Sequence, residues 1–189
     1  MVKRETIRSM LKAGRHRLDP GRVCEVTELV VKTPRRMRAV IECLFDENAG
    51  MANRAADVLE RITRAKPQPA AGWKDELIGL MAEAKENKFR WNLALTVGRL
   101  PLNAQQAQTA AGILRNWLND RSSIVKTAAM HGLADLTRHD PSLLIEVLDT
   151  LRVLSRSGTP AMRARGRILL TQLEPCERRG SRPTERPTG

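Results

Sequence analysis

The sequence has few aromatic residues and no tyrosine. Phe, Trp and Tyr together make up 3% of its 189 residues, whereas the apolar residues as a whole make up 41%. A core built from Leu, Ala, Ile, Val and Met is typical of helical proteins, because unbranched and small side chains lose little rotamer freedom in a helix. The sequence also lacks Asn-Gly and Asp-Gly turns between alternating apolar runs, the pattern that predicts hairpins. The composition therefore predicts an all-α protein.

Cysteine is scarce, and long apolar runs are missing. Cys24, Cys43 and Cys176 are odd in number and far apart, so we expect neither a disulfide framework nor a zinc site. No apolar run approaches the roughly 18 residues that a membrane span needs. Charged residues interrupt the N-terminal segment where a signal peptide would be apolar. These features predict a cytoplasmic protein that does not cross a membrane.

The chain is basic, with 33 Lys and Arg residues against 21 Asp and Glu and a formal net charge of +12. The excess lies mostly at the two ends. Residues 1–38 contain 11 basic and 4 acidic residues, and residues 175–189 contain 4 and 2. The middle, 39–174, is nearly balanced, with 18 and 15. Because basic terminal segments often bind nucleic acid, nucleic acid is one candidate partner.

Four segments of the chain share one twelve-residue pattern. Each opens on a large apolar residue, usually followed by a basic one, has small residues in the middle, and closes on an apolar residue. The four opening residues are Met51, Phe89, Val125 and Met162, so the spacings are 38, 36 and 37 residues. A near-constant period of this length predicts stacked helical units rather than one globular core.

Turn and capping residues divide the chain around these units. Thr33-Pro34 and Asp140-Pro141 each combine an N-cap residue with a proline suited to the first helical position. A connector over residues 66–72 contains Pro and Gly, and we expect it to be flexible. The predicted boundaries are a basic N-terminal helical cap over 1–32, four repeats over 33–64, 72–101, 105–137 and 140–174, and a disordered basic tail over 175–189.

The repeated unit resembles the second helix of a HEAT repeat. The residues that carry this resemblance are the steps Phe89-Arg90, Val125-Lys126 and Met162-Arg163, the ninth-position residues Leu59, Val97, Leu133 and Leu170, and the turn residues Asp46 and Asp120. The signature of tetratricopeptide repeats is absent. The chain is thus similar to armadillo-like HEAT-repeat solenoids, including bacterial ones without an assigned activity. The resemblance implies a right-handed α-α superhelix of about four helix pairs that acts as a scaffold.

Helical geometry gives each unit a buried side and an outward side. At about 100° per residue, positions 1, 5, 8, 9 and 12 form the core side, and positions 3, 7 and 10 lie opposite. In HEAT-like solenoids the second helices line the concave surface, so the resemblance places the opposite positions in a groove. The candidate partner-binding residues are Trp91, Leu95, Thr127, His131 and Ile168, and the first repeat adds Asn53, Asp57 and Glu60. Aligned apolar side chains on a surface favour a peptide-binding groove. The alternative is that Trp91 folds sideways against the next repeat.

A second set of candidates is basic. Arg90, Lys126 and Arg163 recur at position 2, where they would form ion pairs with turn acids such as Asp120 or attract anions. Arg163 and Arg167 share a face near the start of the last helix, where free N–H groups and the helix dipole favour anions. The alternative for these arginines is ordinary solvation. We carry Arg90, Lys126, Arg163 and Arg167 forward as candidate anion- or nucleic-acid-binding residues.

Catalytic signals are missing from the sequence. His16, His131 and His139 are too dispersed for a metal cluster, and no Gly-rich phosphate loop or Ser or Cys nucleophile motif is present. Asp57, Asp135 and Trp91 would share one groove, and some DNA-repair glycosylases are built from HEAT-like repeats. No motif here matches theirs position by position. We therefore expect no enzyme activity, no cofactor and no metal.

Three functions remain as hypotheses. The favoured one is a non-enzymatic adaptor or scaffold that binds a protein partner on its concave surface. The alternative is a nucleic-acid-binding protein that uses its basic termini with Arg163 and Arg167. The third is a glycosylase of the HEAT-like type. The sequence identifies neither the partner nor the oligomeric state.

Overall fold

The computed structural model describes residues 5–14, 16 and 19–180. Within these residues the chain forms only helices, which confirms the all-α prediction. The α-helices are α1 (Ile7–Lys12), α2 (Val23–Lys32), α3 (Met37–Leu44), α4 (Ala49–Ala65), α5 (Lys74–Glu83), α6 (Asn87–Val97), α7 (Ala104–Trp117), α8 (Ser123–Leu136), α9 (Leu144–Ser157) and α10 (Pro160–Gly180). Three 3₁₀ helices accompany them: η1 (Pro34–Arg36), η2 (Gln68–Trp73) and η3 (Pro141–Leu143).

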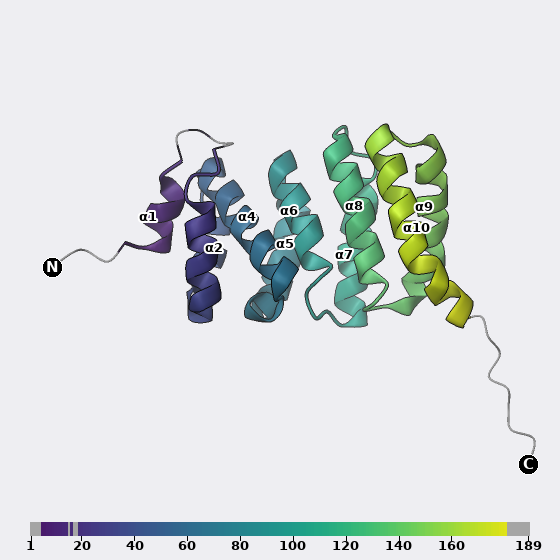
Figure 1. The fold of residues 1–189 in the computed structure, drawn as a ribbon, viewed down its shortest axis with the longest axis horizontal. Coiled ribbons are helices and arrows are strands. Elements are labelled where there is room, and N and C mark those ends of the chain that lie inside the picture. The colour runs from purple at the N-terminus through teal and green to yellow at the C-terminus, as the bar shows by residue number, and fades with distance from the viewer. Residues whose placement is uncertain (1–4, 15, 17–18, 181–189) are drawn as a thin grey trace, which may run out of the picture.

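The helices stand side by side in an elongated row that runs from α1 at one end to α10 at the other (Figure 1). Consecutive helices pack as pairs, α3 with α4, α5 with α6, α7 with α8 and α9 with α10. The second helix of each pair also packs on the second helix of the next, so α4, α6, α8 and α10 form a continuous layer. Three of the four twelve-residue units lie within these second helices, and the fourth begins at Phe89 in α6 and ends three residues past it, at Leu100.

The N-terminal segment continues this arrangement. Helix α2 packs on α4, as the later second helices do on one another, and α1 packs on α3 and α4. The turn between α1 and α2 ends at Gly21, whose φ of 52° lies in the left-handed region that favours glycine. The Asp19 side chain accepts a hydrogen bond from the Gly21 N–H at 2.7 Å. Helices α1 and α2 are therefore a pair stacked on α3 and α4.

Capping side chains explain where several helices begin. Asn48 accepts a hydrogen bond from the Met51 N–H at the start of α4, and Ser122 accepts one from Val125 at the start of α8. At the start of α7, Asn103 and Gln106 form a reciprocal capping box. Each cap satisfies backbone donors that the first turn of a helix leaves free.

The second helices approach one another closely. A Cβ on Gly132 of α8 would lie 2.8 Å from the Ala94 carbonyl oxygen of α6, and a Cβ on Gly98 would lie 2.7 Å from the Asp135 Cβ. Glycine at these positions lets the α6 and α8 backbones come into contact. As a result, the second-helix layer also buries polar side chains, including Asn92 and Thr96, each 0% exposed.

Two segments differ from expectation. The connector expected to be flexible contains η2, and its Ala70 is fully buried. Pro67 and Pro69 fix φ near the value that a 3₁₀ turn requires. The segment predicted to be disordered from residue 175 overlaps the end of α10, which continues through Pro175 to Gly180. Residues 181–189 of that predicted tail lie outside the described residues. Across the part of the chain that the structure describes, no helix combines the length and the apolar character needed to cross a membrane.

Candidate binding surfaces

The second helices leave one side uncovered by the first helices. We call this side the second-helix face, and it carries Asp57, Trp91, Ile124, Thr127, His131 and Ile168. Ile168 is 50% exposed and Ile124 is 62% exposed. Trp91, Thr127 and His131 are half-buried. Leu95, which the sequence analysis placed in a groove, is only 8% exposed, because the second helices pack closely.

An apolar hollow lies at the start of α6 and α8. Trp91, Ile124 and Lys88 line a space of about 350 Å³. The Lys88 Nζ lies 3.8 Å from Asp57 Oδ2, which directs its charge toward α4. Trp91 belongs to the predicted groove, whereas Ile124 stands one residue before the repeat frame and was missed for that reason. The hollow offers an indole ring and an exposed aliphatic side chain to a ligand.

Near the opposite end of α6, the face carries a buried carboxylate. The Glu60 side chain is 1% exposed and accepts hydrogen bonds from Arg64 at 2.5 Å and from Arg99 at 2.9 Å. Burial acts to raise the pKa of Glu60, but the two guanidinium groups outweigh it and hold that pKa below its ordinary value. Because Arg99 follows α6 and Glu60 lies on α4, this contact ties the first two second helices together.

His131 occupies the middle of the face, among charged groups. Its Nε2 lies 3.8 Å from Asp135 Oδ2 on the same helix. Burial lowers the pKa of His131 below the ordinary 6.5, and the positive charges of Arg165, Arg99 and Arg138 lower it further, whereas Asp135 acts in the opposite direction. The imidazole is therefore neutral near pH 7. From His131 toward its α10 end, the face carries an excess of positive charge.

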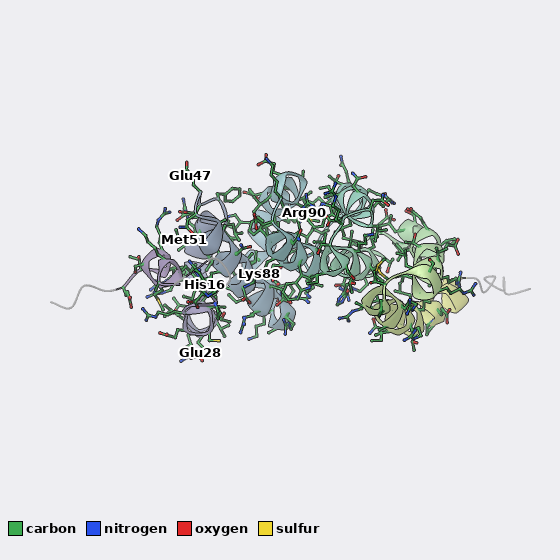
Figure 2. The ribbon with its side chains drawn as sticks, turned by 90° about the horizontal axis from the view of Figure 1, so that it is seen from above. His16, Glu28, Glu47, Met51, Lys88 and Arg90 are labelled. Atoms are coloured by element: carbon green, nitrogen blue, oxygen red, sulfur yellow. The ribbon has the colours of Figure 1, made fainter. Side chains whose placement is uncertain are left out.

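The predicted basic residues divide into two groups. Arg90 points away from the second-helix face; it forms an ion pair with Asp120, donates to the Ala84 carbonyl at 2.6 Å and lies over the Trp117 ring, 5.5 Å from its centroid. Figure 2 shows Lys88 and Arg90 on different sides of α6. The ion-pair interpretation of Arg90 is thus confirmed.

The other three basic residues lack such a partner acid within the described residues. Arg163 donates to the Gly158 carbonyl at 2.8 Å and so closes the end of α9. Lys126 is half-buried, and Arg167 is exposed. One N–H group of Arg163 is thus engaged with the preceding helix, and the shared anion site of Arg163 and Arg167 stays a prediction. Both arginines are exposed, and the Arg167 side chain forms no hydrogen bond or ion pair with another described residue that would compete with an anion.

A separate cleft, which the sequence analysis missed, lies between the first helices α3 and α5. It consists of two hollows of about 400 Å³ and 290 Å³ that share Phe45 as a lining residue. Phe45 is 56% exposed. One sequence signal could have indicated this cleft. Phe45 is an apolar residue that follows the last buried position of α3 and lies near an irregular connector.

No group of three or more His, Cys, Asp and Glu side chains that could hold a metal ion occurs in the described part of the chain. The comparison with known proteins gave no match, either among protein-family models or among curated proteins.

Proposed function

We propose that the chain is a non-enzymatic scaffold of HEAT-like repeats that binds a segment of a partner protein on its second-helix face. The observation that carries the proposal is the hollow in which Trp91 and the exposed Ile124 lie together. An aromatic residue beside an exposed aliphatic one, in a hollow, is the composition of a protein-binding anchor site. The HEAT-like assignment rests on the repeat spacing and on the packing of second helix on second helix.

The charges around the hollow support a peptide as ligand. Toward α4 the face presents Asp57, which pairs with Arg61 and Lys88. Toward α8 and α10 it presents Arg165, together with Arg138, which pairs with Asp135. An extended segment along this face would meet an apolar anchor site flanked by charged side chains, which add specificity to the apolar contact. We place this scaffold in the cytoplasm, since Cys43 is buried as a free thiol and Cys24 is exposed as one.

The test uses two matched substitutions. Ile124 and Ile145 are the second residues of α8 and α9 and are 62% and 67% exposed. Ile124→Asp introduces a charge into the hollow, whereas Ile145→Asp introduces the same charge on a first helix, away from it. Affinity capture from the native host, followed by titration of the captured protein, should show binding that Ile124→Asp weakens about tenfold or more. Equal affinity of the two variants would refute the second-helix face as the binding surface.

Nucleic-acid binding is the second candidate, and exposed Arg167 beside the positively charged end of the face favours it. Neutralisation of phosphates would make the logarithm of the binding constant fall linearly with the logarithm of salt concentration. A gel-shift titration with duplex and single-stranded DNA at two salt concentrations measures this slope. Arg167→Gln should reduce the slope by about one if Arg167 contacts a phosphate. Absence of a shift at low salt would refute the second candidate and leave the first intact.

A further inference from the structure

The cleft between α3 and α5 follows from the irregular connector. Helix α5 packs on α7, but on its other side η2 contacts both α3 and α5. The hollow beside the start of α5 is lined by Ile41 of α3, by Phe45 directly after α3, and by Trp73 of the connector. The hollow beside the end of α5 is lined by Leu80 of α5 and Phe89 of α6, again with Phe45. The cleft therefore has an apolar floor that runs along both helices.

Carboxylates surround this floor. The lining residues of the two hollows include six acids and two bases; the acids are Glu42, Asp46, Glu47, Glu76, Glu83 and Glu86, and the bases are Arg38 and Lys85. This local excess of negative charge stands in a chain whose formal net charge is +12. The cleft therefore differs in sign from the molecule as a whole.

Three of these carboxylates are available to a ligand. Asp46 pairs with Arg8, and Glu42 pairs with Arg38 at 3.0 Å. Glu47, Glu76 and Glu83 are exposed, and none of them forms an ion pair or a hydrogen bond with another described residue. Glu47 extends outward from the turn between α3 and α4, on the opposite side of the row from Glu28 (Figure 2).

A buried amide marks the same cleft independently. Asn53 of α4 lines the larger hollow, is 1% exposed, and has a side-chain oxygen with no hydrogen-bond partner in the described part of the chain. A buried acceptor without a donor costs about 1–3 kcal/mol. An N–H group of a ligand seated in the hollow would supply the missing donor.

We infer that this cleft binds a basic amphipathic helix of a partner protein, with apolar side chains on the floor and Lys or Arg side chains against the rim. Glu76 and Glu83 stand on one face of α5, seven residues and so about 10 Å apart along the helix. Two turns of a bound helix cover that length, with anchors at spacings of three, four and seven residues. The chain's own residues 181–189, Ser-Arg-Pro-Thr-Glu-Arg-Pro-Thr-Gly, contain no large apolar side chain, so they lack the anchor that the floor requires.

The test measures fluorescence anisotropy with a labelled helical peptide that carries Leu on one face and Lys on the other. Two control peptides replace all Leu by Gln or all Lys by Glu. The full chain should bind the first peptide and neither control, because the cleft recognises both the apolar and the basic side. Binding of the Gln peptide with equal affinity would show general attraction of cations and would overturn the inference.

Matched variants locate the peptide on the protein. Phe45→Ala should weaken binding about tenfold or more, whereas Ile145→Ala, at a similarly exposed position on α9, should not. Glu47→Lys, alone or together with Glu83→Lys, should weaken binding about tenfold or more through like-charge repulsion, whereas Glu28→Lys on the opposite side should have no such effect. The inference would be overturned if Phe45→Ala and Ile145→Ala weakened peptide binding equally, or if Glu47→Lys and Glu28→Lys did.

Two further results would also overturn it. Loss of peptide binding in Ile124→Asp with Phe45→Ala unaffected would assign the peptide to the second-helix face. Concentration-dependent dimerisation in gel filtration, lost in Phe45→Ala, would assign the cleft to a second copy of this chain. Because Ile124 and Phe45 lie on different surfaces, failure of this inference leaves the proposed function standing.

Discussion

The contact of Glu60 with two arginines allows the effect of burial to be measured at one carboxylate. Arg99 and Arg64 both donate to Glu60, but the Arg99 side chain is 16% exposed and the Arg64 side chain is 64% exposed. Substitution by Met keeps an unbranched stem and removes the charge. Arg99→Met leaves the buried carboxylate with a single, solvent-screened partner, whereas Arg64→Met leaves it with the buried one.

The magnitude follows from this difference. Loss of one partner from a buried ion pair costs about 3–5 kcal/mol, and the remaining Arg64 contact reduces that cost. We therefore expect Arg99→Met to lower the free energy of unfolding by about 2–3 kcal/mol. Arg64→Met removes an exposed partner, which is worth about 0.2–1 kcal/mol. Urea denaturation followed by circular dichroism at pH 7 gives both values. If the free energy of unfolding falls with urea concentration at the same slope in both variants as in the unsubstituted protein, the two-state comparison holds.

The pH dependence provides an independent check of the same contact. The folded-state pKa of Glu60 lies below its ordinary 4.5, so the stability that this carboxylate contributes is present above pH 4.5 and is lost as pH falls through the folded-state value. The cost of Arg99→Met should therefore shrink below pH 4.5. In addition, Glu60→Gln should recover part of the stability in the Arg99→Met background. Equal costs for Arg99→Met and Arg64→Met, or no recovery with Glu60→Gln, would refute the reasoning.

Two other predictions concern the second-helix layer. Gly132→Ala should destabilise the protein by about 1–3 kcal/mol, because its Cβ would meet the Ala94 carbonyl oxygen. Gly112→Ala, where a Cβ meets nothing within 4 Å, should stabilise the protein by about 0.5–1 kcal/mol. Thermal denaturation measures both changes in stability, and the same sign for both would contradict this packing. The lowered pKa of His131 means that the unfolded chain binds more protons than the folded one below about pH 6.5, so the free energy of unfolding should fall as pH drops below that value. Urea denaturation between pH 7.5 and 5.5 should show a smaller fall in His131→Gln. The same pH dependence of the free energy of unfolding in the two proteins would contradict the assignment to His131.

Much of the fold follows from short-range regularities in the sequence. The apolar spacing of units such as Val125–Leu136 predicts a helix with one buried side, and the period of about 37 residues predicts that second helices stack. Caps such as Asn48 and Ser122 then determine where those helices begin. These features are local, so one sequence suffices to predict the elements and their pairing.

The burial of individual outward positions could not be predicted in the same way. Leu95 and Ile168 occupy the same position in their units, yet one is 8% exposed and the other 50%. Leu95 lies in α6, which has second helices on both sides, whereas Ile168 lies in α10 at the end of the row. Periodicity within one helix gives the direction of a side chain, but exposure depends on how closely the neighbouring helix approaches, and that depends on residues such as Gly132 in another repeat.

The basic position shows the same dependence on neighbours. Arg90 and Arg163 hold equivalent places in their units, and both donate to a backbone carbonyl near the end of the preceding first helix. Arg90 also reaches Asp120, because the next turn carries an acid there, whereas no repeat follows α10 within the described residues to supply one. A shared sequence pattern thus predicts the first contact but not the second.

The most distinctive surface arises where the repeat is least regular. At regular positions a side chain that would serve as a ligand contact also lies beside the next repeat, so close stacking buries it, as in Leu95. The connector with η2 interrupts the first-helix layer and leaves Phe45 exposed beside Trp73. Packing cannot bury Phe45 there, since the helix that would cover it is displaced by the connector. An irregular segment in a stacked-helix protein is therefore the place where a binding cleft can form without weakening the stack.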